Sequence, residues 1–109
     1  MFYEMRTYTI KVGKVPEYLK HFEEKGLPVI TKYAKLVAWW YTDIGELNQV
    51  IHVWEYESMD DRAVKRRQLY QDPDWIEKFV PTAFPMLEKQ ESKLLYAADF
   101  SPIGGKNKS

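Results

Sequence analysis

The chain has 109 residues, which is the size of one domain. Its 16 Lys and Arg residues balance its 16 Asp and Glu residues, so the formal net charge at pH 7 is zero. This balance excludes a global attraction to nucleic acid or to an anionic membrane surface, and neither partner is expected. The sequence contains no cysteine, which excludes disulfides and thiolate chemistry and fits a cytoplasmic protein.

Aromatic residues are unusually frequent for this length, with 4 Trp, 8 Tyr and 5 Phe. A monomer of this size has a modest core, because it buries only about 65% of the surface that its unfolded chain exposes. We therefore expect some of the rings to line a cavity or a partner interface. His21 and His52 are too few for a multi-histidine metal centre, and no cofactor is expected.

The first part of the chain predicts a strand followed by an irregular helix. Residues 2–10 are rich in β-branched and aromatic types, as strands are. The apolar positions of residues 15–33 recur with helical spacing, and Pro16 suits the first turn of a helix. Gly26 and Pro28 fall inside this pattern, which predicts a kink there.

The second part predicts a hairpin, a broken helix and a last strand. Residues 36–43 and 48–57 are two strands joined by a turn. The helical region 59–80 follows a Ser58 N-cap, and Asp72-Pro73 predicts a break near Gln71. The remaining segments are a short turn between two prolines, a strand and a surface tail: Pro81 to Pro85, residues 90–98 and residues 101–109.

The order β-α-β-β-α-β predicts an α+β, ferredoxin-like plait: a four-stranded antiparallel sheet with both helical regions on one face. The strands nevertheless carry apolar residues at both parities: Val50, Trp54 and Trp40 at one, and Ile51, Val53 and Trp39 at the other. A sheet that is apolar on both faces needs two covers, and one chain supplies helices for one. We therefore expect a homodimer, packed sheet to sheet around a twofold axis.

Several segments resemble the NIPSNAP family: Tyr3-Glu4-Met5-Arg6-Thr7-Tyr8-Thr9-Ile10, Leu47-Asn48-Gln49-Val50-Ile51-His52-Val53-Trp54, Asp72-Pro73-Asp74-Trp75 and Phe100-Ser101-Pro102. The resemblance implies a dimeric α/β barrel. It divides the chain into a NIPSNAP-like domain at residues 1–103 and a polar tail at 104–109. It implies little chemistry.

In such a plait the strands at residues 2–10 and 48–57 are central neighbours. If their register places even-numbered positions on one face, a set of polar and aromatic side chains converges there: Glu4, Arg6, Tyr8, Asn48, His52, Trp54 and Tyr56. One interpretation is a ligand pocket in which His52 and Arg6 are catalytic and the other residues bind the ligand. The alternative is a buried Glu–Arg–His network that fixes the register or the dimer contact.

Three functions compete. The first is binding, with or without oxidation, of a small aromatic or hydrophobic molecule in this pocket. Its catalytic version resembles cofactor-independent monooxygenases of the dimeric barrel class, with His52 as base and with Arg6, Asn48 and Tyr56 holding an oxyanion. The second is a non-catalytic homodimeric interaction module. The third is haem binding or degradation through His21 or His52, because dimeric α/β barrels include haem proteins.

Overall fold

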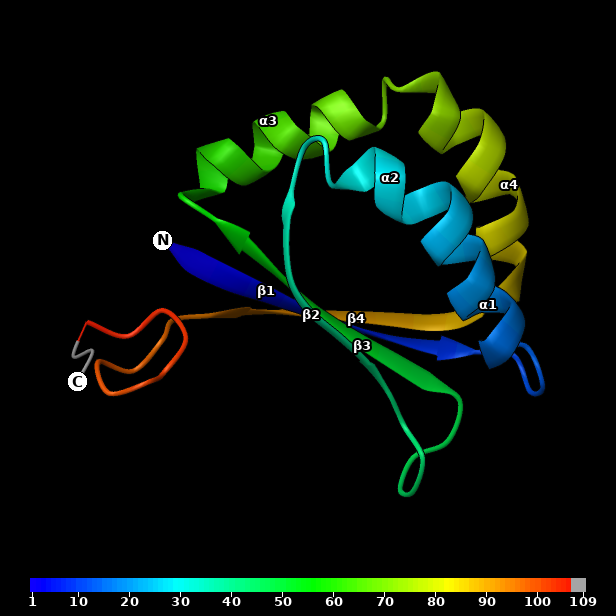
Figure 1. Ribbon diagram of the computed structural model, residues 1–109, viewed down its shortest axis with the longest axis horizontal. Helices are drawn as coiled ribbons and strands as arrows, with labels where there is room; N and C mark the ends of the chain where they lie inside the picture. The colour runs from blue at the N-terminus through cyan, green and yellow to red at the C-terminus, as the bar shows by residue number, and fades with distance from the viewer. Residues whose placement is uncertain (107–109) are drawn as a thin grey trace.

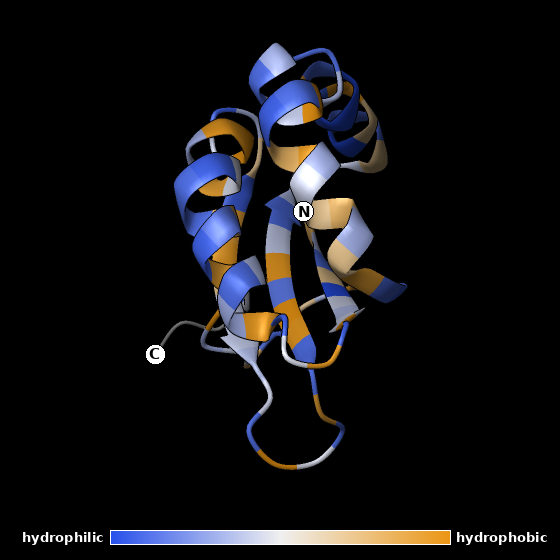
Figure 2. Ribbon diagram, turned by 90° about the vertical axis from the view of Figure 1, so that its right-hand side faces the viewer, coloured by the Kyte–Doolittle hydropathy of each residue, from blue (hydrophilic) through white to orange (hydrophobic). Residues whose placement is uncertain are grey.

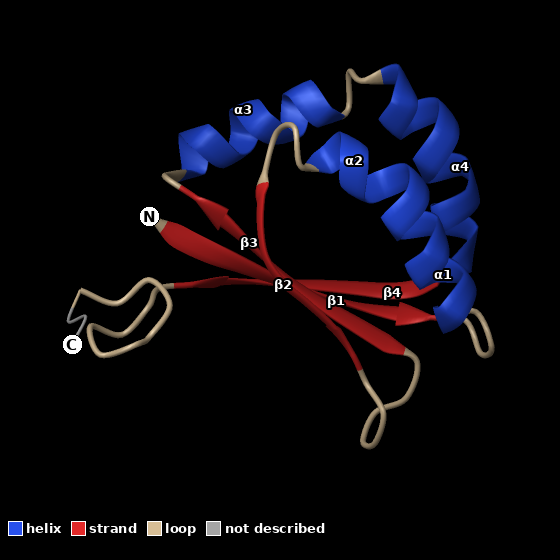
Figure 3. Cartoon of the chain, viewed as in Figure 1, coloured by secondary structure: helices blue, strands red, loops and turns tan. Residues whose placement is uncertain are grey.

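The computed structural model describes residues 1–106. Four strands form an antiparallel sheet in the order β2-β3-β1-β4, and the helices cover one of its faces (Figures 1 and 3). The strands are β1 (Phe2–Ile10), β2 (Lys35–Tyr41), β3 (Gln49–Tyr56) and β4 (Leu87–Leu95). The fold is the α+β, ferredoxin-like plait that the element order predicts.

Two helical arms connect the strands and curve over the same face of the sheet (Figure 1). The first arm comprises α1 (Val15–His21), the π-helical turn η1 (Phe22–Gly26) and α2 (Leu27–Ile30). The second comprises α3 (Met59–Leu69), the π-helical turn η2 (Asp74–Phe79), α4 (Val80–Ala83) and the 3-10 turn η3 (Phe84–Met86). No helix within residues 1–106 is long and apolar enough to cross a membrane.

Each arm contains a π-helical turn just before a proline. In the first arm the N–H of Leu27 bonds to the carbonyl oxygen of Phe22, one residue farther back than in an α-helix. The next residue, Pro28, lacks an N–H and its ring would clash with the carbonyl group four residues earlier, which the wider turn relieves. The second arm repeats this arrangement before Pro81. The departure from a straight helix predicted near Gly26 is therefore confirmed.

The register of the two central strands decides which side chains face the helices. Glu4 lies opposite Trp54, and Arg6 lies opposite His52. Even-numbered positions of β1 and β3 consequently share the helix-covered face, as predicted, and most of them are buried. Bands of different hydropathy follow one another along the strands in Figure 2.

The two adjacent tryptophans of β2 lie on opposite faces. After a bulge in β2, the register pairs Trp39 with His52, so Trp39 faces the helices. Trp40 lies on the outer face and is 56% exposed. Parity in the sequence grouped Trp40 with Val50 and Trp54, and this grouping is wrong because the hairpin and the bulge, not residue numbers, set the pairing.

The last strand lies earlier than the sequence indicates, at Leu87–Leu95 rather than residues 90–98. It is an exposed edge strand, so alternation of apolar and polar residues marks its ends poorly. Beyond it, Ser101 and Ile103 line a shallow surface pocket together with Tyr3, so this part of the predicted tail packs on the outer face. Residues 107–109 of the predicted tail lie outside the described residues.

Candidate functional site

A cavity of about 50 Å³ lies between the helix-covered face of the sheet and the two arms. Most of its lining residues are aromatic, and they include Tyr8 and Trp39 from the sheet and Phe22, Trp75 and Phe79 from the arms. The volume accommodates only one or a few water-sized groups, since a water needs about 10–15 Å³ measured in this way. Most of the chain's aromatic rings therefore surround one small space.

One side of the cavity opens to solvent. Three of its lining residues are exposed, namely Tyr70 at the end of α3, Phe84 in η3 and Gln90 on β4. By contrast, His52 and Trp54 at the sheet are 3% and 2% exposed. The cavity thus has a deep end at the sheet and an aromatic entrance.

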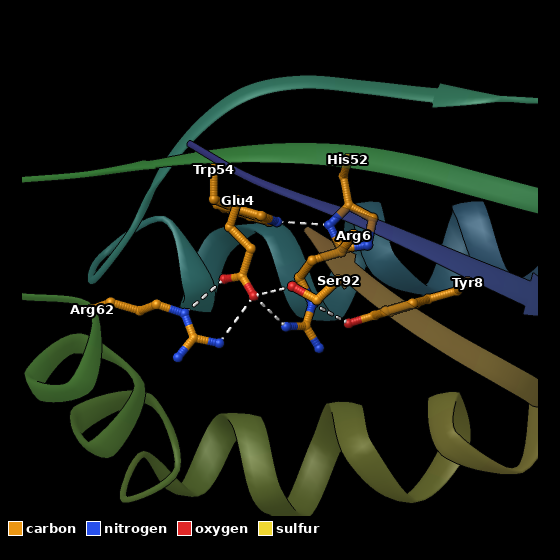
Figure 4. A network of polar contacts seen from close by, with 7 residues as sticks. All are labelled: Glu4, Arg6, Tyr8, His52, Trp54, Arg62 and Ser92. Carbon is orange, nitrogen blue, oxygen red and sulfur yellow. Dashed lines mark hydrogen bonds and ion pairs between the residues drawn. The ribbon is translucent and has the colours of Figure 1, made fainter. Parts of the chain in front are cut away.

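Glu4 is completely buried and forms the centre of a charge network beside the cavity (Figure 4). Arg62 on α3 donates two hydrogen bonds to its carboxylate, from Nε to Oε1 at 3.0 Å and from Nη2 to Oε2 at 2.9 Å. Arg6 donates from Nη1 to Oε2 at 2.9 Å, and the Ser92 hydroxyl donates to the same oxygen. One carboxylate therefore stands between two guanidinium groups, and the network carries a net positive charge.

The partners of Glu4 hold it ionised. Burial alone would raise its pKa, but hydrogen bonds from Arg62 and Ser92, with the charges of Arg6 and Arg62, lower the pKa to about 2. Glu4 does not line the cavity. Glu4 and Arg6 are thus part of a buried network, as the second interpretation of the sequence predicts, but its other members are Arg62 and Ser92 rather than His52.

Arg6 links this network to the cavity. It lines the cavity, and its Nε donates to the hydroxyl of Tyr8 at 2.8 Å. The guanidinium also lies over the Tyr8 ring, 5.4 Å from its centroid. Arg6 therefore brings a cation to the cavity wall while its other end neutralises Glu4.

His52 is held in one tautomer by its neighbour on the same strand. The indole N–H of Trp54 lies 2.6 Å from Nδ1 of His52 (Figure 4). Because an indole can only donate, Nδ1 must accept, and the proton of the neutral ring sits on Nε2. Burial lowers the pKa of His52 to about 3, with a further contribution from the charge of Arg6. His52 is thus a neutral N–H donor.

Three buried polar atoms have no hydrogen-bond partner among residues 1–106: Nε2 of His52 and Nε1 of Trp39 and Trp75. All three belong to residues that line the cavity. The rings of Trp39 and His52 stack at 4.1 Å with an interplanar angle of 10°, so two of these donors are immediate neighbours. Buried polar groups are normally paired, so these three donors lack the partner that such groups usually have.

Phe22 and Trp39 form a wall between this cavity and an open groove of about 420 Å³. Both side chains line both spaces, and their rings stack at 4.0 Å. Leu19 and Leu36 lie on the groove side. The two spaces therefore share these two side chains in their linings.

The structure brings together most of the residues that the sequence selected. Arg6, Tyr8, His52, Trp54 and Tyr56 all line the cavity. Asn48 does not line it. It has φ 64° before the start of β3, and its carbonyl oxygen accepts the N–H of Ile10 at 2.7 Å. Its expected place on the strand is therefore wrong, because asparagine here takes the left-handed conformation that ends the hairpin loop.

Sequence reasoning missed Arg62 and Ser92, the other two partners of Glu4. The need for partners was visible, because a charge on a central strand is costly to bury alone. The face of α3 that lies against the sheet was not visible from the sequence. Trp39 and Trp75 were also not assigned to the site, although both residues line the cavity and have unpaired indole N–H groups.

His21 has a structural position between the arms. Its Nε2 lies 2.9 Å from the carbonyl oxygen of Phe79, and its ring stacks on Phe79 at 5.1 Å. His52 is bound to Trp54 through its other ring nitrogen. Within residues 1–106, no group of three or more His, Cys, Asp or Glu side chains could hold a metal ion. Haem binding stays a prediction, without support from the geometry of either imidazole.

The model of the NIPSNAP family matches residues 3–102. Human Protein NipSnap homolog 3A is 35% identical over 97 residues, which make up 88% of this chain and 39% of that protein. Protein NipSnap homolog 3B of Mus musculus is 31% identical over 104 residues, 94% of this chain and 42% of that protein. The chain thus spans well under half the length of these curated relatives.

Solved structures give the same assignment. An uncharacterised NIPSNAP domain protein from Burkholderia xenovorans is 47% identical, with a TM-score of 0.88 over 94% of this chain and 99% of that chain. Protein Atu4242 from Agrobacterium tumefaciens is 40% identical, with a TM-score of 0.91 over 94% and 98%. An antibiotic biosynthesis monooxygenase is 12% identical, with a TM-score of 0.63 over 90% and 99%, a likeness of fold alone. The chain belongs to the NIPSNAP family.

Proposed function

We propose that this protein binds a small aromatic or hydrophobic molecule in the cavity between the sheet and the helical arms. The observation that carries this proposal is the ring of aromatic side chains around one unfilled space. Protein interiors otherwise pack as densely as organic crystals. A space of about 50 Å³ beside the core leaves its lining side chains without packing partners on one side. A purely structural core would gain by closing it.

The polarity of the cavity supports binding rather than turnover. A base that removes a proton from a ligand needs a free ring nitrogen facing that ligand. In His52 the acceptor nitrogen is taken by Trp54, and Asn48, expected as an oxyanion donor, lies outside the cavity. The monooxygenase-like version of the first hypothesis assigned the base to His52, and this arrangement disfavours that role. The side chains of the cavity therefore support the proposal of binding without turnover.

The proposal is tested with a library of small aromatic molecules screened by ligand-observed NMR. We expect at least one to bind, and to shift the indole N–H signals of Trp39 and Trp75 in the ¹H–¹⁵N spectrum. The indole signal of Trp40, on the outer face, serves as the internal control. Binders that shift only Trp40, or no binders at all, would contradict the proposal.

A second proposal concerns assembly, and the outer face of the sheet supports it. Trp40 is 56% exposed and Leu95 is 38% exposed on this face, with Ile51 and Val53 half-buried beside them. Contiguous exposed apolar surface of this kind marks interaction sites. We infer a homodimer with the outer faces packed together. This assembly leaves the cavity on the helix-covered face free, so it is compatible both with ligand binding and with the alternative of an interaction module.

A further inference from the structure

Among the residues that line the cavity, the buried polar side-chain atoms without a hydrogen-bond partner in residues 1–106 are all N–H donors. Nε2 of His52 and the indole nitrogens of Trp39 and Trp75 all carry hydrogen and have no partner among the described residues. His52 is 3% exposed and Trp75 is 5% exposed, so these groups lie well below the surface. A buried donor without an acceptor costs free energy. A ligand that relieves this cost must therefore offer acceptors.

The charged side chains that line the cavity are all basic. Arg6, Lys65 and Arg66 line the cavity, whereas no Asp or Glu of the described chain does. The nearby carboxylate of Glu4 is already shared between Arg6 and Arg62. Asp61 is paired with Lys65 at 3.1 Å. An aromatic cage for an organic cation is disfavoured, because such a ligand would meet the guanidinium of Arg6.

Building on the proposed function, we propose that the ligand is a small planar molecule bearing an oxyanion, a carboxylate or a phenolate. Its oxygen is bound at the deep end by the N–H groups of His52 and Trp39, with Arg6 supplying positive charge. The cavity of about 50 Å³ fits such a head group. The apolar body then lies toward the open side, between Tyr70 and Phe84.

The test compares three molecules of nearly equal shape: benzoate, benzyl alcohol and benzylamine. Their affinities are measured by titration calorimetry at pH 7, where benzoate is an anion and benzylamine is a cation. We expect benzoate to bind roughly tenfold or more tightly than benzyl alcohol, because hydrogen bonds to a charged acceptor are the stronger ones. Benzylamine is expected not to bind.

A matched pair of variants locates the binding. Trp39→Phe keeps a ring in the stack on His52 but removes the N–H, and is expected to weaken benzoate binding roughly tenfold. Trp40→Phe makes the same chemical change on the outer face and should leave the affinity unchanged. If Trp39→Phe does not fold, the indole and His52 N–H signals of the unmodified protein give the same information, since benzoate must shift them.

The outcomes separate this inference from the proposed function. If benzyl alcohol or benzylamine binds as tightly as benzoate, the cavity is a binding site but the oxyanion preference is wrong. The same holds if benzoate binds but Trp39→Phe has no more effect than Trp40→Phe. If none of the three binds and the wider aromatic library also yields no ligand, the proposed function itself fails. Tight benzoate binding that is sensitive to Trp39 supports both.

Discussion

Trp54 and His52 lie two residues apart on β3, and their hydrogen bond of 2.6 Å determines the chemistry of the cavity floor. Because Trp54 donates to Nδ1, the proton of His52 stays on Nε2, the nitrogen without a partner. The strand thus presents a donor to the cavity at the position where the sequence predicted a base.

Trp54→Phe removes this donor while keeping an aromatic ring. We expect the His52 ring to change from a single Nε2–H tautomer to a mixture, since nothing then holds Nδ1 as an acceptor. Long-range ¹H–¹⁵N spectra of the imidazole distinguish the two forms. An Nδ1–H tautomer in the unmodified protein would show that the donor assignment is wrong.

His52 also makes stability depend on pH. Its pKa is about 3 in the folded protein against 6.5 for an ordinary histidine, so the unfolded state binds the proton first. The free energy of unfolding should therefore fall as the pH drops below 6.5. Between pH 6.5 and 4.5 this loss amounts to about 2–3 kcal/mol at 1.36 kcal/mol per unit. Urea unfolding across this range measures it.

His52→Gln is the control for that loss, because glutamine does not titrate. The variant should show a flatter dependence of stability on pH between 6.5 and 4.5, whatever its absolute stability. An equally steep dependence in His52→Gln would assign the effect to other groups.

Glu4→Gln should strongly destabilise the fold at pH 7. The substitution leaves Arg6 and Arg62 next to each other without their shared counter-ion, and breaking a buried pair typically costs about 3–5 kcal/mol. Glu55→Gln is the matched control, since Glu55 pairs with the exposed Lys35 at 3.4 Å and should change stability by about 1 kcal/mol or less. Denaturant midpoints of the two variants compare them directly.

The same carboxylate adds a second acid-sensitive step. Because its pKa is lowered from 4.5 to about 2, Glu4 stabilises the fold above pH 4.5, and this contribution is lost as the pH falls from 4.5 toward 2. In Glu4→Gln the step should be absent. If the variant loses stability over this interval as steeply as the unmodified protein does, other carboxylates are responsible.

Gly26→Ala tests the packing of the two arms. A Cβ at this position would lie 2.8 Å from Cδ2 of Phe22 and 2.8 Å from Cε1 of Phe79, so both rings would have to move. Overpacking costs about 1–3 kcal/mol, and the helical preference of alanine returns about 1 kcal/mol. We expect a lower melting temperature, with Glu24→Ala in the same turn nearly neutral. Equal or higher stability would show that the arms have room to spare.

Trp40→Glu tests the proposed homodimer. A charge placed on the outer face should oppose its packing against a second copy, and sedimentation velocity should change from dimer to monomer. Tyr41→Glu is the control: Tyr41 is 61% exposed, and it belongs to the opposite face. A dimer that tolerates Trp40→Glu would place the interface elsewhere.

The sequence predicts correctly those features of the fold that depend only on the alternation of residues along a strand and on the order of the elements. Element order and the alternation of β1 and β3 were sufficient for the plait and for the shared face of Arg6 and His52. The position of Asn48 was missed because its φ of 64° depends on the hairpin loop. Arg62 was missed because the rotation of α3 over the sheet depends on tertiary packing. The Trp54–His52 bond joins residues i and i+2 of one strand and could have been anticipated.

The stacked pair of Phe22 and Trp39 belongs to the lining of two spaces, the cavity under the helical arms and the open groove. Because both rings line the 50 Å³ cavity and the 420 Å³ groove, the size of each space depends on the residue types and rotamers at these two positions. Replacing Phe22 by a smaller residue would remove side-chain volume from the lining of both spaces. Under the proposed binding function, substitutions at these two positions would change the ligand size while the sheet stays the same.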